Sequence, residues 1–382
     1  MVKSEKGCSM SKGQRATIAM LATIAWMICD FPSAFAQWVP YGPGARARHS
    51  AVYDSATTTM IVFGGTDLGT INYDDVWVAS SVLQRALLQW SFENPTGTAP
   101  AGRSGHSAVY DSVNSRMIVF GGAEGFPSPC ANDVWMLQNA NGLGGTPGWV
   151  ELNPGGKRSS LPPPRVGHVA AYDPNTDVMM VFGGSNCSGG YLNDFWVFSN
   201  ANGLGGTPAW KQITPSGTPP PARAYAVAGY NSTNNTLVIY GGTDGAELSD
   251  VWVLSGADGT TGTSAWSQVS PSGTAPAVRY GAAYGYDQAN DRLIINGGYS
   301  TRGVLADTWV LDSATGAAGS PSWVSVTTSN NASQLYFHSG IYVASASEFL
   351  VFGGISQRSP QSTVAQDDMF LLSGASSLAK GR

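Results

Sequence analysis

The chain has 382 residues, of which 42% are hydrophobic and 12% charged, and it contains 48 glycines and 22 prolines. This composition is typical of many short strands joined by tight turns, and it excludes a disordered chain because apolar residues suffice for a packed core. The formal net charge of −5 disfavours a nucleic-acid partner, since phosphate binding requires a basic surface.

Residues 1–36 predict a secretory signal peptide. Four basic residues precede an apolar run from Ala16 to Cys29, and Ala34-Phe35-Ala36 forms a small-x-small cleavage site before Gln37. The run is too short to span a bilayer comfortably, which argues against the alternative of an uncleaved anchor. Four basic and two acidic residues lie in this segment, so the mature chain carries 16 basic and 23 acidic residues. We expect a soluble protein, secreted or periplasmic, with no membrane span.

A unit of similar sequence then repeats six times. Within each unit the order is a short strand, an apolar strand ending in Gly-Gly, a variable loop, Asp-x-Trp opening a third strand, and a hairpin leading to a fourth strand. The even spacing of 56 to 62 residues is typical of a propeller or a solenoid. The six pairs are Gly64-Gly65, Gly121-Gly122, Gly183-Gly184, Gly241-Gly242, Gly297-Gly298 and Gly353-Gly354.

Strands ending in Gly-Gly and followed by a Trp, in six copies, resemble the kelch repeat, and the resemblance covers residues 37–372. It implies an exported, bacterial-type, all-β protein: a six-bladed β-propeller with four antiparallel strands per blade. Five units have a fourth strand that opens on a tryptophan: Trp90, Trp149, Trp210, Trp266 and Trp323. The sixth has none, so we expect the mature N-terminal strand Gln37-Trp38-Val39 to close the last blade. Residues 373–382 are expected to form a polar tail.

Two sets of polar residues precede the first strand of each unit. Five arginines stand 18 residues before the Gly-Gly pair: Arg46, Arg103, Arg165, Arg223 and Arg279, with Leu335 in the sixth unit. Three residues further on come His49, His106, His168 and His338, with Ala226 and Ala282 in units four and five. We interpret the histidines as structural residues lining the channel, and expect no metal, because no carboxylate pair supports them.

In kelch propellers that bind acidic peptides, arginines entering the innermost strand contribute to the binding face, so the resemblance implies a ligand-binding role for this set. The alternative is that each arginine pairs with an aspartate and ties the blades together. The aspartates, two residues before the third-strand aromatic, are Asp75, Asp133, Asp194, Asp250, Asp307 and Asp368.

The variable loops between the second and third strands share the arginine-lined face with the loops between the fourth and first strands. They carry candidate ligand contacts for a sugar or a peptide: Tyr73, Phe126, Tyr191, Tyr299 and Arg302. Cys130 and Cys187 lie in these loops in neighbouring units, and the sequence leaves open whether they form a disulfide.

The sequence therefore predicts an exported, monomeric, non-catalytic binding or scaffold module without a cofactor. Its expected partner is a glycan or protein ligand on the arginine-lined face, because no nucleophile–base pair, phosphate loop or metal cluster stands out from the repeat. The alternative is a sugar-acting enzyme similar to the sialic-acid mutarotase or galactose oxidase among kelch proteins, with Glu124 or Glu247 as the acid–base.

Overall fold

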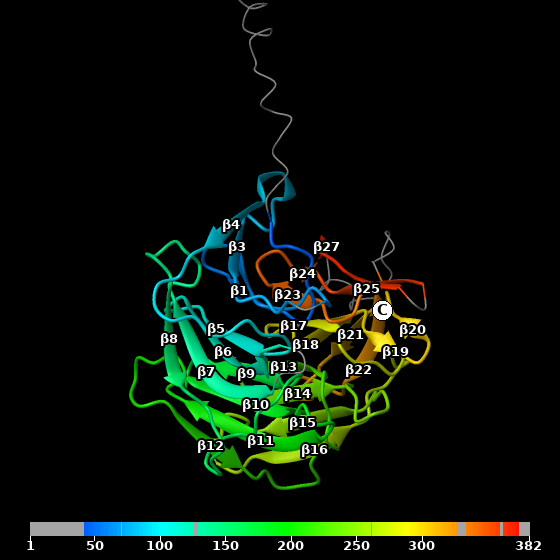
Figure 1. Cartoon of the computed structure of the whole chain (residues 1–382). Coiled ribbons are helices and arrows are strands. Elements are labelled where there is room, and N and C mark those ends of the chain that lie inside the picture. The colour runs from blue at the N-terminus through cyan, green and yellow to red at the C-terminus, as the bar shows by residue number, and fades with distance from the viewer. Residues whose placement is uncertain are drawn as a thin grey trace, which may run out of the picture. The chain divides into compact units, whose positions relative to one another are not determined.

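The structure is a computed structural model that describes residues 42–69, 71–125, 129–260, 262–326, 334–359 and 362–373. Within them, antiparallel strands form six blade sheets arranged in a ring (Figure 1) and two further two-stranded sheets. This arrangement confirms the prediction of an all-β, six-bladed propeller. The predicted signal peptide and the closing strand Gln37–Val39 lie outside the described residues.

The first three blades each have four strands in sequence order, counted outward from the channel. Blade 1 consists of β1 (Ser50–Asp54), β2 (Thr59–Phe63), β3 (Val76–Ser80) and β4 (Gln89–Glu93), with a short 3-10 helix, η2 (Arg85–Leu87), before β4. Blade 2 consists of β5 (Ser107–Asp111), β6 (Arg116–Ala123), β7 (Cys130–Gln138) and β8 (Gly148–Asn153). Blade 3 consists of β9 (Val169–Asp173), β10 (Val178–Ser185), β11 (Tyr191–Ser199) and β12 (Ala209–Ile213).

The other three blades follow the same order, and two of them carry an extra hairpin in the loop between their second and third strands. Blade 4 consists of β13 (Val227–Asn231), β14 (Thr236–Tyr240), β15 (Val251–Ser255) and β16 (Ala265–Val269). Blade 5 consists of β17 (Ala283–Asp287), β18 (Arg292–Asn296), β21 (Thr308–Asp312) and β22 (Ser322–Val326), with the hairpin β19 (Tyr299–Ser300) and β20 (Gly303–Val304). Blade 6 consists of β23 (Ser339–Val343), β24 (Glu348–Phe352) and β27 (Met369–Ser373), with the hairpin β25 (Ile355–Ser359) and β26 (Ser362–Ala365).

The blades close into a ring. Each innermost strand contacts the next, and β23 of blade 6 contacts β1 of blade 1. Just before these strands, six residues at the same position of the repeat form a circle of backbone hydrogen bonds, in which each N–H donates to the carbonyl of the preceding blade at 2.6 to 3.0 Å. We call these six residues the collar: Arg48, Gly105, Gly167, Tyr225, Gly281 and Phe337.

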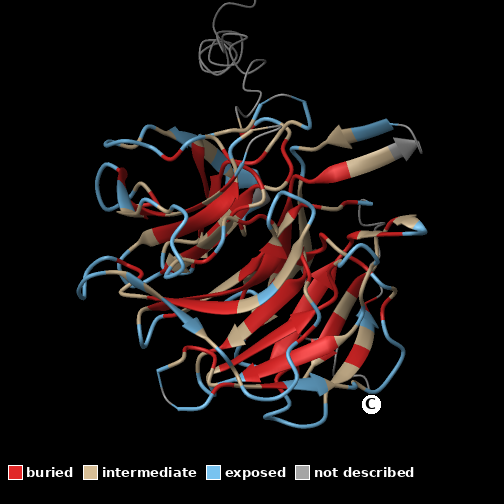
Figure 2. Cartoon of the chain, turned by 60° about the horizontal axis from the view of Figure 1, so that its bottom comes forward, coloured by how far each residue is buried: buried red, intermediate tan, exposed pale blue. Residues whose placement is uncertain are grey.

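The core lies between blades, and aromatic pairs form much of it. The tryptophan of each fourth strand packs on the aromatic residue before the Gly-Gly pair of the preceding blade, as with Trp149 on Phe63 at 5.0 Å and Trp210 on Phe120 at 4.8 Å between ring centroids. Trp90 of blade 1 packs in the same way on Phe352 of blade 6, at 5.2 Å. Figure 2 shows buried residues concentrated in the strands and exposed ones in the connecting loops.

The Gly-Gly pairs are required by close approach between blades. At Gly64 the φ angle is +65°, and a Cβ there would lie 2.8 Å from the carbonyl oxygen of Arg103 in the next blade. A Cβ on Gly65 would lie 2.7 Å from the Cβ of His49 in the same blade. A side chain at either position would push the innermost strands apart, which explains why the pair recurs in all six units.

Candidate functional site

The arginines of the predicted ring are buried and fully paired. Arg103 is 0% exposed, and its Nη1 and Nη2 donate to the two carboxylate oxygens of Asp133 at 2.7 and 2.9 Å. The same guanidinium also donates to the carbonyls of Gly121 and Ala101. Trp135 Nε1 donates to Asp133 Oδ2 at 2.6 Å, so the aspartate, the arginine, the tryptophan and the glycine pair form one network.

This network recurs in blades 1 to 5. The pairs are Arg46–Asp75, Arg103–Asp133, Arg165–Asp194, Arg223–Asp250 and Arg279–Asp307, all bidentate. Burial alone would raise the pKa of Asp250, but hydrogen bonds from Arg223 and Trp252 hold that pKa below its ordinary value. In blade 6, where Leu335 replaces the arginine, Asp368 is exposed.

The interpretation of these five arginines as a ligand-binding surface is therefore corrected. At 0 to 1% exposure they offer no surface to a ligand, and the pairing alternative describes them. Each pair joins two loops of one blade rather than two blades. The link to the preceding blade comes from the backbone, as where Gly65 N–H donates to the Arg103 carbonyl at 2.8 Å.

The predicted loop residues lie in different environments. Tyr73 is half-buried beneath Arg46, whose guanidinium carbon lies 4.3 Å from the ring centroid. Tyr191 opens β11 opposite Ser185, and Arg302 is exposed at the tip of the β19–β20 hairpin. Phe126 lies outside the described residues. Tyr299 joins an aromatic cluster at the channel mouth.

The two cysteines form a disulfide, which answers the question that the sequence left open. Cys130 begins β7 in blade 2, Cys187 lies between β10 and β11 in blade 3, and their Cα atoms are 5.8 Å apart. The bond joins the strand 2–3 loops of neighbouring blades on the face where the collar lies.

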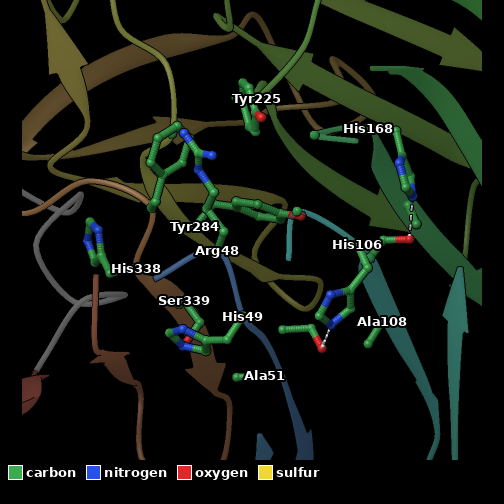
Figure 3. A pocket seen from close by; sticks show the side chains of 18 of the residues that line it. Arg48, His49, Ala51, His106, Ala108, His168, Tyr225, Tyr284, His338 and Ser339 are labelled. Atoms are coloured by element: carbon green, nitrogen blue, oxygen red, sulfur yellow. Dashed lines mark hydrogen bonds between the residues drawn. The ribbon is translucent and has the colours of Figure 1, made fainter. Parts of the chain in front are cut away.

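An unpaired arginine stands at the channel mouth. The guanidinium carbon of Arg48 lies 4.4 Å from the ring centroid of Phe337 and 5.7 Å from that of Tyr225 (Figure 3). Its Nε is buried without a hydrogen-bond partner, and no carboxylate among the described residues lies within ion-pair distance. Within the described part of the chain, Arg48 thus presents a positive charge that no carboxylate pairs.

Aromatic side chains from blades 4 to 6 surround this arginine. Phe337 contacts Tyr225 at 4.8 Å and Tyr336 at 5.0 Å between ring centroids. Tyr299 bridges Tyr336 and Tyr280 at 5.3 and 5.5 Å. We call these five residues the aromatic wall. Burial, together with Tyr336 and Tyr299, raises the pKa of Tyr280 to about 12, so its hydroxyl remains protonated at neutral pH.

Arg48, Tyr225 and Phe337 adopt a backbone conformation that disfavours them. Their φ angles are +55°, +56° and +55°, and the other three collar positions are glycine. Such strain is typically about 1–3 kcal/mol per residue and clusters at functional sites. The sequence contains an indication of this site, because Arg48 stands where three other units have glycine. The prediction instead rested on the arginines two residues earlier, which recur more regularly.

Beneath the collar, the channel is a cavity of about 280 Å³ lined by the four histidines. Each histidine bonds the preceding blade: His106 Nε2 to Ser50 Oγ at 2.9 Å, His168 Nε2 to Ser107 Oγ at 2.8 Å, His49 Nε2 to Ser339 Oγ at 2.9 Å and His338 Nε2 to Asn296 Oδ1 at 3.0 Å. Burial lowers the pKa of His106 and of His338 to about 3. Neutral histidines that link blades agree with the structural role expected of them.

The described residues contain no group of three or more His, Cys, Asp or Glu side chains placed to hold a metal ion. Among the same residues, no helix has the length and apolarity needed to cross a bilayer.

Comparison with known proteins shows that the chain belongs to the kelch-repeat family. The family model described as the KLHDC2/KLHL20/DRC7 Kelch-repeats domain matches residues 34–138 and 80–260. Human host cell factor 2 is 30% identical over 251 residues, covering 62% of this chain and 29% of that protein. An F-box/kelch-repeat protein of Arabidopsis thaliana is 29% identical over 217 residues, covering 56% of this chain and 42% of the relative. The chain thus aligns with less than half the length of these relatives.

A solved structure titled "Structure of YjhT" has the same fold. It superimposes with a TM-score of 0.56 at 15% sequence identity, covering 86% of this chain and 99% of that one. The likeness supports the propeller architecture.

Proposed function

We propose that this kelch propeller is an exported, non-catalytic binding module that recognises a carboxylate-bearing glycan or protein ligand at the mouth of its channel. The observation that carries the proposal is Arg48, which no described carboxylate pairs and which packs on the rings of Phe337 and Tyr225. Guanidinium groups bind carboxylates through two parallel hydrogen bonds, and the aromatic wall offers planar surfaces to a sugar or a peptide.

The strained collar supports a functional role for Arg48 rather than a structural one. Glycine occupies this position in blades 2, 3 and 5 and maintains the same circle of hydrogen bonds. The fold therefore does not need a side chain there. The predicted signal peptide supports export, and places the ligand outside the cytoplasm.

Arg48→Gly and Arg48→Lys test the proposal. Glycine restores the residue that three other blades use, so we expect an unchanged or higher melting temperature. Binding to acidic members of a glycan array or of an acidic peptide library should weaken by roughly tenfold to a hundredfold, because a charge-assisted hydrogen bond is lost. Lysine keeps the charge but not the planar pair of donors, so we expect partial loss.

Arg158→Ala is the matched control, since it removes an exposed positive charge from the loop between β8 and β9, on the same face. It should leave binding within about twofold of the wild type, because exposed charges contribute little. Equal binding by the wild type and Arg48→Gly would overturn the proposal.

One observation favours a sugar-acting enzyme as the second candidate. Glu247 pairs with Thr243 in the strand 2–3 loop of blade 4, and its carboxylate helps to raise the pKa of the Tyr280 phenol in blade 5. Glu124, the other acid–base candidate, is held by Arg103 at 3.1 Å. Acceleration of sialic-acid anomerisation by the wild type, followed by NMR and lost in Glu247→Gln, would support the enzyme; a wild-type rate equal to the uncatalysed rate would exclude the enzyme.

A further inference from the structure

The channel is not uniform around its circumference. Ala226 and Ala282 stand in blades 4 and 5 where the other four blades have histidine. Both alanines line the cavity, next to Tyr225, Tyr284 and Phe337. In the other four blades the lining includes the histidines and the serines Ser50, Ser107 and Ser339, together with Ala51, Ala108 and Ala170. The channel therefore has one side without histidine, in blades 4 and 5, which we call the alanine side, and one side that carries the histidines and serines.

The alanine side lacks the imidazoles that lie between blades elsewhere. A Cβ on Gly64, Gly121, Gly297 or Gly353 would meet the Cε1 of the next blade's histidine at 2.8 to 3.2 Å. At Gly183 the three nearest atoms belong to backbone, and at Gly241 no side-chain atom lies within 4 Å. Replacing histidine by alanine thus removes an imidazole from each of these two blade boundaries.

A second substitution accompanies each alanine. In blades 1 to 3 the histidine bonds the serine that follows the channel histidine of the preceding blade. The corresponding partner positions for Ala226 and Ala282 are Val169 and Val227, which pack in the same apolar clusters as the alanines. The histidine–serine hydrogen bond is thus replaced by an alanine–valine contact at both of these blade boundaries. The alanine side therefore differs from the other blades in both residues of each pair.

We propose that the channel binds a compact monocarboxylate, with its carboxylate on Arg48 and an aromatic or aliphatic group inserted on the alanine side. This inference rests on the proposed function, because Arg48 holds the carboxylate in both, and deepens it by naming the ligand class. The cavity volume of about 280 Å³ suits a small molecule. Apolar surface inserted there leaves water and meets methyl groups and aromatic rings.

Figure 3 shows Tyr284 extending into the channel near Arg48, so the inserted group would lie against this ring. The two ends of the site differ in chemistry: a cation at the mouth, and methyl groups and aromatic rings below it. A polyhydroxylated acid would leave its hydroxyls against the apolar lining and should bind more weakly than benzoate or butyrate.

Two paired variants close the alanine side with the repeat's own residues. Ala226→His/Val169→Ser and Ala282→His/Val227→Ser recreate the histidine–serine tie of blades 1 to 3, so we expect folded proteins. The converse pair, His106→Ala/Ser50→Val, is the control: it removes a tie of the same kind from blade 2, which does not adjoin the alanine side.

Binding of benzoate, butyrate, gluconate and benzyl alcohol to the purified protein should be measured by NMR titration, with the alanine methyl groups labelled. We expect benzoate and butyrate to shift the Ala226 and Ala282 methyl signals and to bind at least tenfold more weakly to the two closing variants. The control pair should bind within about threefold of the wild type. Benzyl alcohol, without a charge, and gluconate should bind much more weakly than benzoate.

The outcomes separate this inference from the proposed function. The contrary result is that gluconate and benzoate bind equally well, with no change in the closing variants and loss of binding in Arg48→Gly. That result would overturn the insertion on the alanine side and leave Arg48 as the residue that binds the carboxylate. Failure of all three carboxylates to bind would also overturn the insertion, whatever happens with glycans or peptides. If a closing variant does not fold, the shifts of the Ala226 and Ala282 methyl signals in the wild type still test the insertion.

Discussion

At the residue scale, arginines two positions apart have opposite environments. Arg46 is 1% exposed and paired with Asp75, whereas Arg48 lies at the channel mouth without an ion-pair partner among the described residues. The difference arises from the backbone. Arg48, like the other collar residues, has a positive φ, and its side chain points out of the blade toward the channel. The regular arginines therefore stabilise the scaffold, and the irregular one is available to a ligand.

Arg103→Ala tests the scaffold role. The substitution removes both guanidinium hydrogen bonds to Asp133, which keeps only that of the Trp135 indole, and leaves the Gly121 carbonyl without its arginine donor; breaking a buried pair typically costs about 3–5 kcal/mol. We expect the free energy of unfolding to fall by that amount in chemical denaturation. Arg302→Ala, at an exposed position, should change it by less than about 0.5 kcal/mol. A melting temperature of Arg103→Ala equal to that of the wild type would contradict the burial and pairing described.

The residues of the site were only partly predictable from the sequence. Spacing placed Arg46 and Asp75 at fixed positions in the repeat, but it did not distinguish a paired arginine from an exposed one, because pairing depends on how two loops meet in three dimensions. Tyr299 was predicted from its loop. Its neighbours Tyr336 and Phe337 were not, because they come from the next blade and only the packing of blade 6 on blade 5 brings them together.

At the element scale, the hairpins of blades 2 and 3 differ from the rest. The ladders β6–β7 and β10–β11 continue past the Gly-Gly pair, as shown by Gly122 opposite Ala131 and Gly184 opposite Leu192. The disulfide joins these extended hairpins across the blade boundary. It constrains the loop face on the side away from the aromatic wall, so that two neighbouring loops there move as one unit.

Reduction of this disulfide should lower the stability of the protein. The bonded residues are 57 positions apart, and closing a chain segment of such length typically contributes about 2–4 kcal/mol. We expect a lower melting temperature in reductant, and no further response to reductant in Cys130→Ser/Cys187→Ser. Alkylation should change the mass of the native protein only after reduction. A wild type that alkylates fully without reductant would show that the bond does not form.

The strands themselves were largely predictable, because alternating apolar residues, Gly-Gly pairs and turn residues define each element locally. The extra hairpins β19–β20 and β25–β26 were not predicted, since they lie in loops whose sequences do not repeat. The closing of blade 6 by Gln37–Val39 stays a prediction. Within the described residues the sheet of that blade has the order β23-β24-β27.

At the scale of the whole molecule, stability depends on contacts that each blade makes with the one before it. The collar hydrogen bonds, the tryptophan pairs and the histidine ties all cross blade boundaries. Blades 4 and 5 lack the histidine tie and rely on apolar packing at the same place. The channel histidines thus stabilise the contacts between blades, and their burial keeps them neutral.

This arrangement predicts how stability depends on pH. Burial lowers the pKa of all four histidines, to about 3 for His106 and His338, whereas the unfolded chain has histidine pKa values near 6.5. As the pH falls below about 6.5, the unfolded state binds protons that the native state does not. The free energy of unfolding therefore decreases by about 1.4 kcal/mol per pH unit for each histidine that stays neutral.

Denaturant titrations between pH 7.5 and 4.5 measure this slope before most carboxylates begin to titrate. His168→Ala/Ser107→Val removes one titrating group, so its slope should be shallower by about 1.4 kcal/mol per pH unit, even if its stability at pH 7.5 is lower. A wild type whose stability is constant from pH 6.5 to 5 would show that the native channel accepts protons as readily as the unfolded chain. In that case solvent, rather than the neighbouring blade, would determine the charge of the histidines.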